Sequence, residues 1–571
     1  MNNKIYKLYF TIIISITFNN YFVQAQTMGL FINDTVNAYK GYTLFAPKQY
    51  TATYLINNQG RLINKWTNSI YPPGQSVYLL PNGHLLRSCM VQGQLGTGGG
   101  EGGRIEEYTW GDTLVWYFNY YSSTYTSHHD IKRLPNGNII MLAVEKKTLA
   151  QLLAAGFNPS KYQPEITTKG YMLPDYVIEV QPTYPSGGTI VWEWHVWDHL
   201  IQDYDSTKSN YGVVANHPEL IDADGDGRQL PCFWNHMNSI SYNAKFDQIM
   251  LSVRGNSEVW IIDHSTTTQQ AAGHTGGRYG KGGDLLYRWG NPKCYGLGNA
   301  SNQKLFEQHD AVWIDSTYPG SGNILVFNNG VGRNFSSVDQ FAPPVDTNGF
   351  YQRTTGTAFG PSAANWTFTA TPPTSFYAPD ICGAQRLPNG NTLICHGTLG
   401  IFFEVNPAGQ TVWKYINPVT NIGPLYQGDS IPHDPTHPFE TMNSEFRIER
   451  YSPTYAGLVG RNLTPGSFIE LYHVGINEEG INIANSFLLK QNFPNPFNPL
   501  TVISYRLPVN GFVSLKIFDI RGKEIFTLVN QVKIAGYYNV EFNSTNLSSG
   551  VYFYKLTIDK LSDVKKMVVV K

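Results

Sequence analysis

A four-residue turn motif that recurs along the chain constrains the fold more than any other feature. Leu-Pro-Asn-Gly stands at residues 80–83, 134–137 and 387–390, each time between two short apolar stretches. Apolar stretches joined by a Pro-Asn-Gly turn are typical of a strand, a tight turn and a returning strand. The chain is therefore expected to consist of repeated antiparallel units.

Each unit continues past its hairpin to a strand that carries tryptophan: Trp116, Trp192, Trp194, Trp289, Trp366 and Trp413. Four antiparallel strands repeated around an axis describe a β-propeller blade, and wide apolar rings fill the wedge between blades. Five units are expected to begin near residues 75, 129, 236, 309 and 382. A sixth takes residues 446–451 as its inner strands and residues 53–57 and 61–66 as its outer ones, which leaves no open sheet edge.

The composition changes after about residue 484. A turn-rich stretch at 491–499 precedes alternating strands at 501–507, 513–519, 538–542 and 551–558. Short alternating strands separated by glycine turns are typical of a small β-sandwich. The predicted fold class is thus all-β, with a six-bladed β-propeller at 26–480 and an immunoglobulin-like β-sandwich at 485–571.

The first 25 residues are typical of a secretory signal peptide. Lys4 and Lys7 precede an apolar run from Leu8 to Phe18, and small residues lie near Ala25. This order is that of a cleaved export signal, so the mature chain is expected to start at Gln26. No later apolar run reaches the roughly 20 residues that span a bilayer, so no transmembrane segment is expected in the mature chain.

Composition and charge limit the partners. The chain has 571 residues, of which 42% are hydrophobic, and a formal net charge of −1. Nucleic acids and anionic membrane surfaces attract proteins with an excess of basic residues. Neither is therefore expected as a partner.

Five cysteines in an exported chain allow two disulfides and one thiol. Cys382 and Cys395 flank the hairpin at 387–390 at similar distances, so a cross-strand bridge between them is one option. The sequence leaves the connectivity open.

Three histidines occupy matching positions in the repeats. Counting five residues back from Leu134 reaches His129, and the same count back from Ile314 reaches His309, while a third copy begins at His236. In a propeller, inner strands begin beside the central channel at one face. The three imidazoles are therefore expected to converge there. The second strands should bring Arg254, Asn328 and Asn329 to the same mouth. Asp130 and Asp310 follow their histidines in the strand and should point away to anchor the backbone.

Two metal interpretations remain open. Asp222, Asp224 and Asp226 alternate with small residues as in the first half of a calcium loop, but position 233 is not acidic. The loop predicts either a structural calcium ion or a solvated acidic turn. Three imidazoles around a channel can also hold zinc, although a nearby arginine would repel a cation.

Several strings taken together resemble the bacterial aryl-sulfate sulfotransferase family. The resemblance spans about residues 40–465. The strings are Gly41-Tyr-Thr-Leu-Phe-Ala-Pro47, His128-His-Asp-Ile131, Asn235-His-Met-Asn238 with Arg254 downstream, Gln308-His-Asp-Ala311, Phe327-Asn-Asn-Gly330, Gly383-Ala-Gln-Arg-Leu-Pro-Asn-Gly390 and Phe446-Arg-Ile-Glu-Arg-Tyr451.

The resemblance implies transfer of a sulfuryl group from an aryl sulfate to a phenol without a nucleotide donor or any catalytic cofactor. His309 matches the nucleophile that becomes a transient sulfohistidine. Arg254 and His236 would stabilise negative charge, and His129 would transfer a proton. The predicted substrate-binding residues are His128, Asn238, Asn328 and Asn329.

One departure from the family and one alternative function stand beside this interpretation. Cys382 occupies the position equivalent to His129 in the fifth unit, where the family often has serine, so the contribution of that unit to the site is in doubt. His396 faces either the channel or the core. The alternative is a non-catalytic surface propeller that binds glycans, sulfated polymers or a protein through the same basic mouth.

The C-terminal region resembles the sorting domain of proteins exported by the type IX secretion system. The pieces that carry this resemblance are Leu515-Lys-Ile-Phe-Asp-Ile-Arg-Gly522 and Ser549-Gly-Val-Tyr-Phe-Tyr-Lys555. It implies transit through the periplasm, the secretion machinery as a partner, and a final location outside the cell or on its surface. A generic adhesive or spacer module is the alternative.

Overall fold

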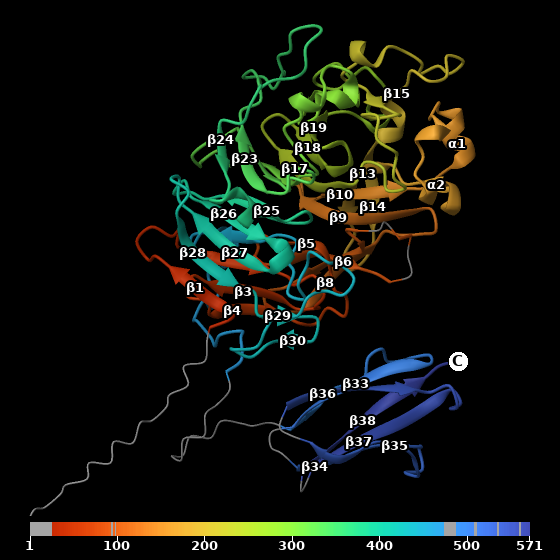
Figure 1. Cartoon of the computed structure of the whole chain (residues 1–571), viewed down its shortest axis with the longest axis vertical. Helices are drawn as coiled ribbons and strands as arrows, with labels where there is room; N and C mark the ends of the chain where they lie inside the picture. Colours follow the sequence, from red (N-terminus) through yellow and green to blue (C-terminus); the bar gives the residue numbers. More distant parts are fainter. Residues whose placement is uncertain are drawn as a thin grey trace, which may run out of the picture. The chain divides into compact units, whose positions relative to one another are not determined.

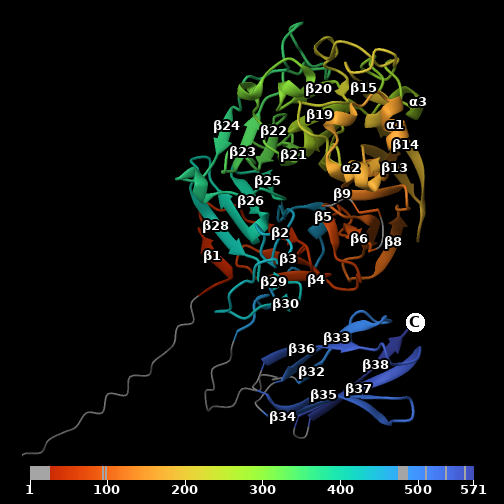
Figure 2. The same cartoon turned by 45° about the vertical axis from the view of Figure 1, so that its right-hand side comes forward.

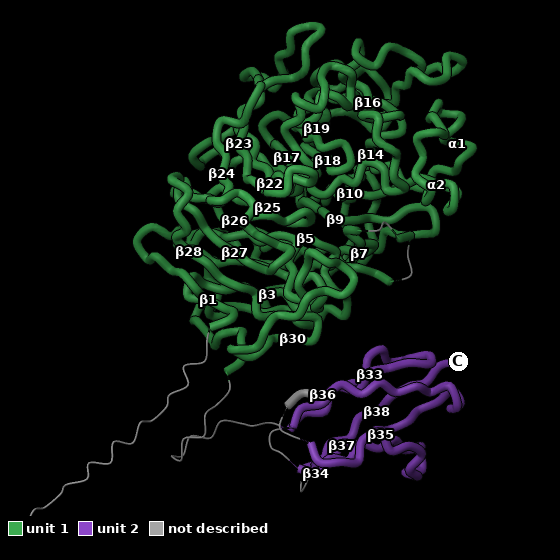
Figure 3. The backbone as a smooth tube through the Cα atoms, viewed as in Figure 1, with its two compact units in different colours: residues 1–473 green, residues 474–571 purple. Residues whose placement is uncertain are grey.

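The chain divides into two compact units, Met1–His473 and Val474–Lys571 (Figure 3). The computed structural model describes residues 26–92, 95–96, 99–472, 487–507, 511–533, 536–558 and 561–571. The predicted signal peptide, residues 1–25, lies outside the described residues. Antiparallel strands dominate the regular secondary structure of both units (Figure 1), which confirms the prediction of an all-β protein.

Six antiparallel sheets of four or five strands contain most of the strand residues in the described part of unit 1 (Figure 2). Sheet 1 contains β31 (Glu449–Tyr451), β2 (Tyr42–Phe45), β3 (Thr53–Asn57) and β4 (Leu62–Trp66). Sheet 2 contains β5 (Pro73–Leu79), β6 (Leu85–Met90), β7 (Gly103–Tyr108) and β8 (Leu114–Asn119). Sheet 3 contains β9 (Tyr125–Arg133), β10 (Ile139–Glu145), β13 (Asp175–Pro182) and β14 (Gly188–His195).

The remaining three sheets follow the same plan. Sheet 4 contains β17 (Met237–Asn243), β18 (Gln248–Val253), β19 (Glu258–Asp263) and β20 (Tyr287–Trp289). Sheet 5 contains β21 (His309–Trp313), β22 (Ile324–Asn328), β23 (Ser337–Phe341) and β24 (Trp366–Phe368). Sheet 6 contains β25 (Gly383–Arg386), β26 (Thr392–His396), β27 (Ile401–Val405), β28 (Thr411–Ile416) and β1 (Gly29–Asn33).

The first strands of successive sheets contact one another: β5 with β9, β9 with β17, β17 with β21, and β21 with β25. Two further links complete the series. The backbone N–H of Arg450 in β31 donates to the side chain of Gln385 in β25 at 2.7 Å. The Leu79 N–H of β5 donates to the Tyr451 hydroxyl of β31 at 2.9 Å. Contacts therefore run from sheet 2 through sheet 6 and sheet 1 back to sheet 2.

Sheet 1 joins the two ends of unit 1, as predicted, because β31 pairs with β2. Two strands differ from the prediction. Residues 446–451 supply one inner strand rather than two, and β2 takes the second inner position. β1 adds an unexpected fifth strand to sheet 6 by pairing with β28. Both are short strands that no Leu-Pro-Asn-Gly turn marks.

The tryptophans of the outer strands fill the space between sheets, as predicted. Trp66, Trp116, Trp194 and Trp413 are fully buried. Each also donates its indole N–H to a backbone carbonyl near the next sheet: Thr109, Gly187, Gly283 and Asn58, at 2.7–2.9 Å. These bonds satisfy the only polar group of a buried ring and attach each sheet to its neighbour.

Asp130 and Asp310 anchor neighbouring inner strands, as predicted. Asp130 Oδ2 accepts from the Ile240 N–H of β17 at 2.9 Å, and Asp310 Oδ2 accepts from the Ala384 N–H of β25 at 3.0 Å. Arg447 binds both carboxylates, and its Nη1 lies 2.8 Å from Asp310.

All five cysteines are buried free thiols. The bridge between Cys382 and Cys395 is therefore not formed. In the β25–β26 register Gly383, not Cys382, lies opposite Cys395. The sulfur of Cys382 instead accepts from the Gly397 N–H at 3.1 Å.

The α-helices of the described part of unit 1 lie in connections within two sheets. α1 (Leu149–Ala154) and α2 (Pro164–Lys169) lie between β10 and β13 of sheet 3, and α3 (Thr268–Ala271) lies between β19 and β20 of sheet 4. The two-stranded pairs are β11 (Lys147–Thr148) with β12 (Tyr171–Met172), β15 (Leu200–Ile201) with β16 (Ile221–Asp222), and, near the end of the unit, β29 (Val419–Thr420) with β30 (Gly423–Pro424). Pro164 begins α2 and Gly170, with φ of 78°, ends it. None of the helices in the described residues is long and apolar enough to cross a membrane.

Unit 2 contains two antiparallel sheets. One consists of β32 (Leu488–Leu489), β33 (Leu500–Leu507) and β36 (Gly536–Asn543). The other consists of β35 (Glu524–Lys533), β34 (Gly511–Phe518), β37 (Gly550–Ile558) and β38 (Leu561–Val569). Alternate residues of both sheets, such as Ile503, Leu515 and Leu556, share one buried cluster.

Candidate functional site

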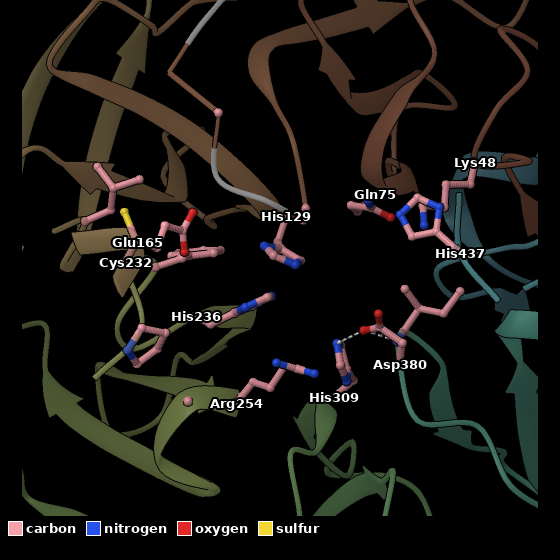
Figure 4. A pocket seen from close by; sticks show the side chains of 18 of the residues that line it. Lys48, Gln75, His129, Glu165, Cys232, His236, Arg254, His309, Asp380 and His437 are labelled. Atoms are coloured by element: carbon pink, nitrogen blue, oxygen red, sulfur yellow. Dashed lines mark hydrogen bonds and ion pairs between the residues drawn. The ribbon is translucent and has the colours of Figure 1, made fainter. Parts of the chain in front are cut away.

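A cavity of about 400 Å³ brings together His129, His236, Arg254 and His309. These are the four residues predicted to carry the chemistry, and they come from three different sheets. Figure 4 shows their side chains pointing into one common space. Convergence of residues 180 positions apart follows from the contacts among β9, β17 and β21.

The backbone turns sharply where the inner strands reach the cavity. Gln75, His129, His236, Asp310 and Cys382 all have φ between 47° and 101°. The pairing of β9, β17 and β21 with the second strand is shifted at the same points. Such left-handed, bulged residues cost energy and are used to redirect side chains at sites. The irregularity turns the histidines toward the cavity.

His309 is held in one orientation by Asn329. The imidazole Nδ1 lies 2.8 Å from Oδ1, the side-chain amide oxygen of Asn329. The amide nitrogen of Asn329 donates to the backbone carbonyls of Ala378 and Ile381, which fixes the direction of the amide. His309 Nδ1 must therefore donate, and Nε2 carries the lone pair.

Burial keeps this imidazole neutral. His309 is buried, and desolvation lowers its pKa to about 4, helped by Arg254 and opposed by the negative charge of Asp380 and the Asn329 hydrogen bond. Asp380 Oδ1 lies 3.7 Å from His309 Nε2. At neutral pH the ring therefore offers an unprotonated nitrogen to the cavity.

A chain of buried groups stands behind His129. Its Nδ1 lies 2.9 Å from Nδ1 of His128, and Nε2 of His128 lies 3.0 Å from Asp175 Oδ1. The Asp175 carboxylate can only accept, so Nε2 of His128 carries the hydrogen; with Nδ1 of His128 as the acceptor, His129 donates through Nδ1 and keeps Nε2 as its own acceptor. Burial, followed by the neighbouring histidines, lowers the pKa of His129 well below its usual value.

The position of the His129 ring also requires a residue without a side chain at position 100, which is Gly100. A side chain at position 100 would overlap the imidazole, since its Cβ would lie 1.7 Å from Cε1. The Gly100 carbonyl accepts from the His129 N–H at 2.9 Å. The loop that carries Gly100 therefore packs directly on the predicted proton-transfer group.

His236 and Arg254 form another wall of the cavity. His236 stacks on Phe233, with ring centroids 4.3 Å apart. Burial and then Arg254 lower the pKa of His236 well below its usual value, so this ring is neutral and can donate one hydrogen bond. Arg254 Nη2 lies 2.6 Å from Glu307 Oε2 and provides the fixed positive charge.

Several wall residues were missed by the sequence analysis: Lys48, Gln75, Lys169, Asp380 and His437. Gln75 follows from the count that found His129, because it stands five residues before Leu80. Asp380 stands two residues before Cys382. Burial opposes its ionisation, but Arg254, His309 and Lys48 outweigh burial and lower the pKa of Asp380.

Three predicted substrate-binding residues lie behind the cavity wall and hold the backbone. Asn238 donates to the Gln308 carbonyl at 2.8 Å. Asn328 accepts from the Phe306 N–H and donates to Asp339. His128 supports His129. His396 bonds with the Tyr377 carbonyl at 3.2 Å and is buried.

The carboxylates of the acidic loop, Asp222, Asp224 and Asp226, do not converge on one point. Asp226 pairs with Arg228 at 2.9 Å, and Asp224 accepts from the Asn158 N–H. Within the described ranges, the only set of three potential ligands in close range is His199, His274 and Asp284. The calcium loop at Asp222, Asp224 and Asp226 stays a prediction.

Comparisons with known proteins identify both units. Residues 48–424 match the family model for arylsulfotransferase (ASST), and residues 491–570 match that for a secretion system C-terminal sorting domain. The sorting domain indicates secretion to the cell surface or outside the cell. A search of curated proteins found no match.

Solved structures show only distant similarity. A protein of unknown function from Bacteroides caccae is 12% identical with a TM-score of 0.37, and the match covers 72% of this chain and 98% of that one. A catalytically inactive virginiamycin B lyase from Staphylococcus aureus is 8% identical with a TM-score of 0.32, covering 68% and 89%.

Proposed function

Since the chain belongs to the arylsulfotransferase family, we propose that it transfers a sulfuryl group from an aryl sulfate to a phenol through a sulfohistidine at His309. The observation that carries this proposal is the fixed tautomer of His309: Asn329 holds Nδ1, and Nε2 is the acceptor in the cavity. The six sheets are proposed to be the blades of a β-propeller, and unit 2 an immunoglobulin-like sandwich.

In the first step His309 Nε2 attacks sulfur. An N–S bond forms, the S–O bond to the aryl group breaks, and its electron pair leaves on the phenolate oxygen. Arg254 stabilises negative charge on the sulfuryl oxygens, and neutral His236 donates a hydrogen bond. The sulfated ring is positive, so the Asn329 carbonyl at Nδ1 and the Asp380 carboxylate stabilise it.

In the second step the acceptor phenol attacks the same sulfur. The phenol loses its proton to His129 as the new O–S bond forms and the N–S bond breaks. The lowered pKa of His129 keeps the ring unprotonated before this step. Asp175 and His128 act as positioning residues that hold the acceptor nitrogen toward the cavity.

The chemistry uses only side chains of this chain, and we propose that no cofactor takes part. Lys48, Lys169 and Arg254 line the cavity together with Glu165 and Asp380, and Arg254, beside the histidines, is the proposed contact of the anionic sulfate ester. The type IX secretion machinery is the proposed partner of unit 2. A binding protein would not need a nucleophile with one fixed lone pair, which favours the enzyme over the non-catalytic alternative.

The test is release of nitrophenol from 4-nitrophenyl sulfate in the presence of a phenol. The wild type should turn over, and intact-protein mass spectra after rapid mixing should show one sulfuryl adduct on the His309 peptide. His309→Ala should lose activity by at least about 10³-fold, as expected for loss of a nucleophile. His217→Ala, an exposed histidine outside the cavity, should keep it.

Asp175→Asn separates the two steps. It should slow turnover while leaving the adduct on His309 in place, because the first step does not use His129 as a base. Full activity of His309→Ala would refute the assigned nucleophile, and a folded wild type without nitrophenol release would refute the function.

A further inference from the structure

A cluster of two histidines and one aspartate lies away from the catalytic cavity, at the junction of sheets 3 and 4. His199 ends the short helix η2 (Val196–His199), and His274 and Asp284 lie in the loop between β19 and β20. Their potential ligand atoms all lie within 4.8 Å of one another. We propose that His199, His274 and Asp284 bind a zinc ion.

The hydrogen bonds of His199 direct its second ring nitrogen toward the cluster. Its Nε2 lies 2.8 Å from the Ala271 carbonyl oxygen, which can only accept, so Nε2 carries a hydrogen. The remaining nitrogen, Nδ1, faces Asp284 Oδ1 at 2.9 Å, so it either donates a second hydrogen to this carboxylate or binds a metal ion together with it.

His274 brings a second nitrogen to the same oxygen. Its Nδ1 lies 2.7 Å from Asp284 Oδ1. Ligand atoms around tetrahedral zinc, at about 2.0–2.1 Å from the metal, are separated by about 3.3 Å. Each of the two nitrogen–oxygen pairs therefore needs to open by less than about 1 Å, and the exposed side chain of His274 can make that movement.

The surroundings of His199 are those of a fixed metal ligand. The ring is fully buried and stacks on Trp194 at 5.6 Å with an interplanar angle of 9°. Donation of the other ring nitrogen to a backbone carbonyl is the usual support of a ligating histidine. Two imidazoles and one carboxylate form a ligand set that binds zinc in preference to calcium or magnesium.

The bound ion would fasten the β19–β20 loop to the end of sheet 3. His199 and Asp284 are 85 residues apart, and Trp194 already bonds to the Gly283 carbonyl in the same loop. Closing such a loop with a metal stabilises the folded chain. The proposed role is structural, because the cluster lies outside the catalytic cavity.

The test is zinc binding by the full chain after removal of metals with a chelator. The wild type should bind one zinc ion with micromolar or tighter affinity in calorimetry, and zinc should raise its unfolding temperature. Cobalt in place of zinc should give the visible bands of a four-coordinate nitrogen and oxygen site.

His274→Ala is the decisive variant because its side chain is exposed and its loss leaves the fold intact. It should weaken binding by at least about tenfold and remove the cobalt bands. His84→Ala is the matched control, since His84 also pairs with one carboxylate, Glu107, but has no second imidazole. It should bind zinc as the wild type does.

Two results would overturn the proposal. If the wild type binds no zinc, the cluster is an ion pair between a protonated His199 and Asp284. If His274→Ala keeps the stoichiometry and affinity of the wild type, the zinc lies elsewhere in the chain.

Discussion

At the scale of single residues, the proposed catalytic histidines follow from a count along the sequence, whereas the residues that support them do not. Counting five residues back from Leu134 and from Ile314 leads to His129 and His309. Asp175 and Asp380 reach the site from the third strand of sheet 3 and from the segment before β25, positions that no repeat marks. Their role depends on contacts between sheets, which a single sequence does not contain.

In the proposed mechanism, the protonation of His309 sets the acid limit of the first step. Only the unprotonated ring would attack sulfur, and its pKa is lowered to about 4 by burial, with Asp380 opposing and Arg254 assisting. The rate of sulfation in a single turnover should therefore be constant from pH 8 to 5 and fall as the pH approaches 4. Stopped-flow release of nitrophenol measures this rate.

Asp380→Asn tests the cause of the limit. It removes the charge that raises the pKa of His309, so the acid limb should move to lower pH. An acid limb near 6.5 in the wild type, the usual pKa of histidine, would contradict the neutral, buried nucleophile.

At the scale of elements, strand hairpins are predictable where a turn motif and a tryptophan bracket them. β3 has the predicted limits, residues 53–57, and its neighbour β4 begins one residue later than expected. β1 and β2 were missed because short strands with few flanking signals acquire their structure from partners distant in sequence. The left-handed residues that redirect the histidines carry no signal either, since none of them is glycine.

His264 joins two neighbouring sheets and should make their stability depend on pH. Its Nδ1 lies 2.7 Å from Asp247, and its Nε2 lies 2.9 Å from Glu179 of β13. Burial disfavours the charged ring, but the bonds to Asp247 and Glu179 outweigh burial and raise its pKa to about 9. The folded state therefore binds a proton more tightly than the unfolded state, whose pKa is about 6.5.

The stabilisation is complete below pH 6.5 and is lost as the pH rises through 9. His264→Gln should lower the free energy of unfolding by about 1–3 kcal/mol at pH 6, the range for hydrogen bonds to charged groups, and by less at pH 9.5. Urea unfolding at both pH values measures the difference. His217→Gln is the control, and an equal loss at both pH values would contradict the charged state.

At the scale of the whole molecule, Arg447 connects the last segment of unit 1 to two histidine-bearing strands. Its guanidinium binds Asp130 of β9, Asp310 of β21 and the Tyr78 hydroxyl of β5, all of which are buried. The family strings included Arg447, but no pattern in the sequence reveals that it meets two carboxylates. That contact exists only once the sheets are assembled.

Arg447→Met should destabilise unit 1 by about 3–5 kcal/mol, because it leaves two buried carboxylates without a cation. Denaturant unfolding of the full chain, followed by tryptophan fluorescence, measures the loss. Arg278→Met, an exposed arginine on a loop, should change the free energy of unfolding by less than about 0.5 kcal/mol. A similar small change for Arg447→Met would contradict its central role.

Sheet 1 combines strands from both ends of unit 1, and this sets the order in which the chain can complete its fold. β31 near the end of unit 1 pairs with β2 near its start. While the ribosome or a translocation pore still holds residue 449, β2 has no partner on its inner side, and this long-range closure must come last. An exported polypeptide gains from this delay, because no partly emerged chain can complete sheet 1.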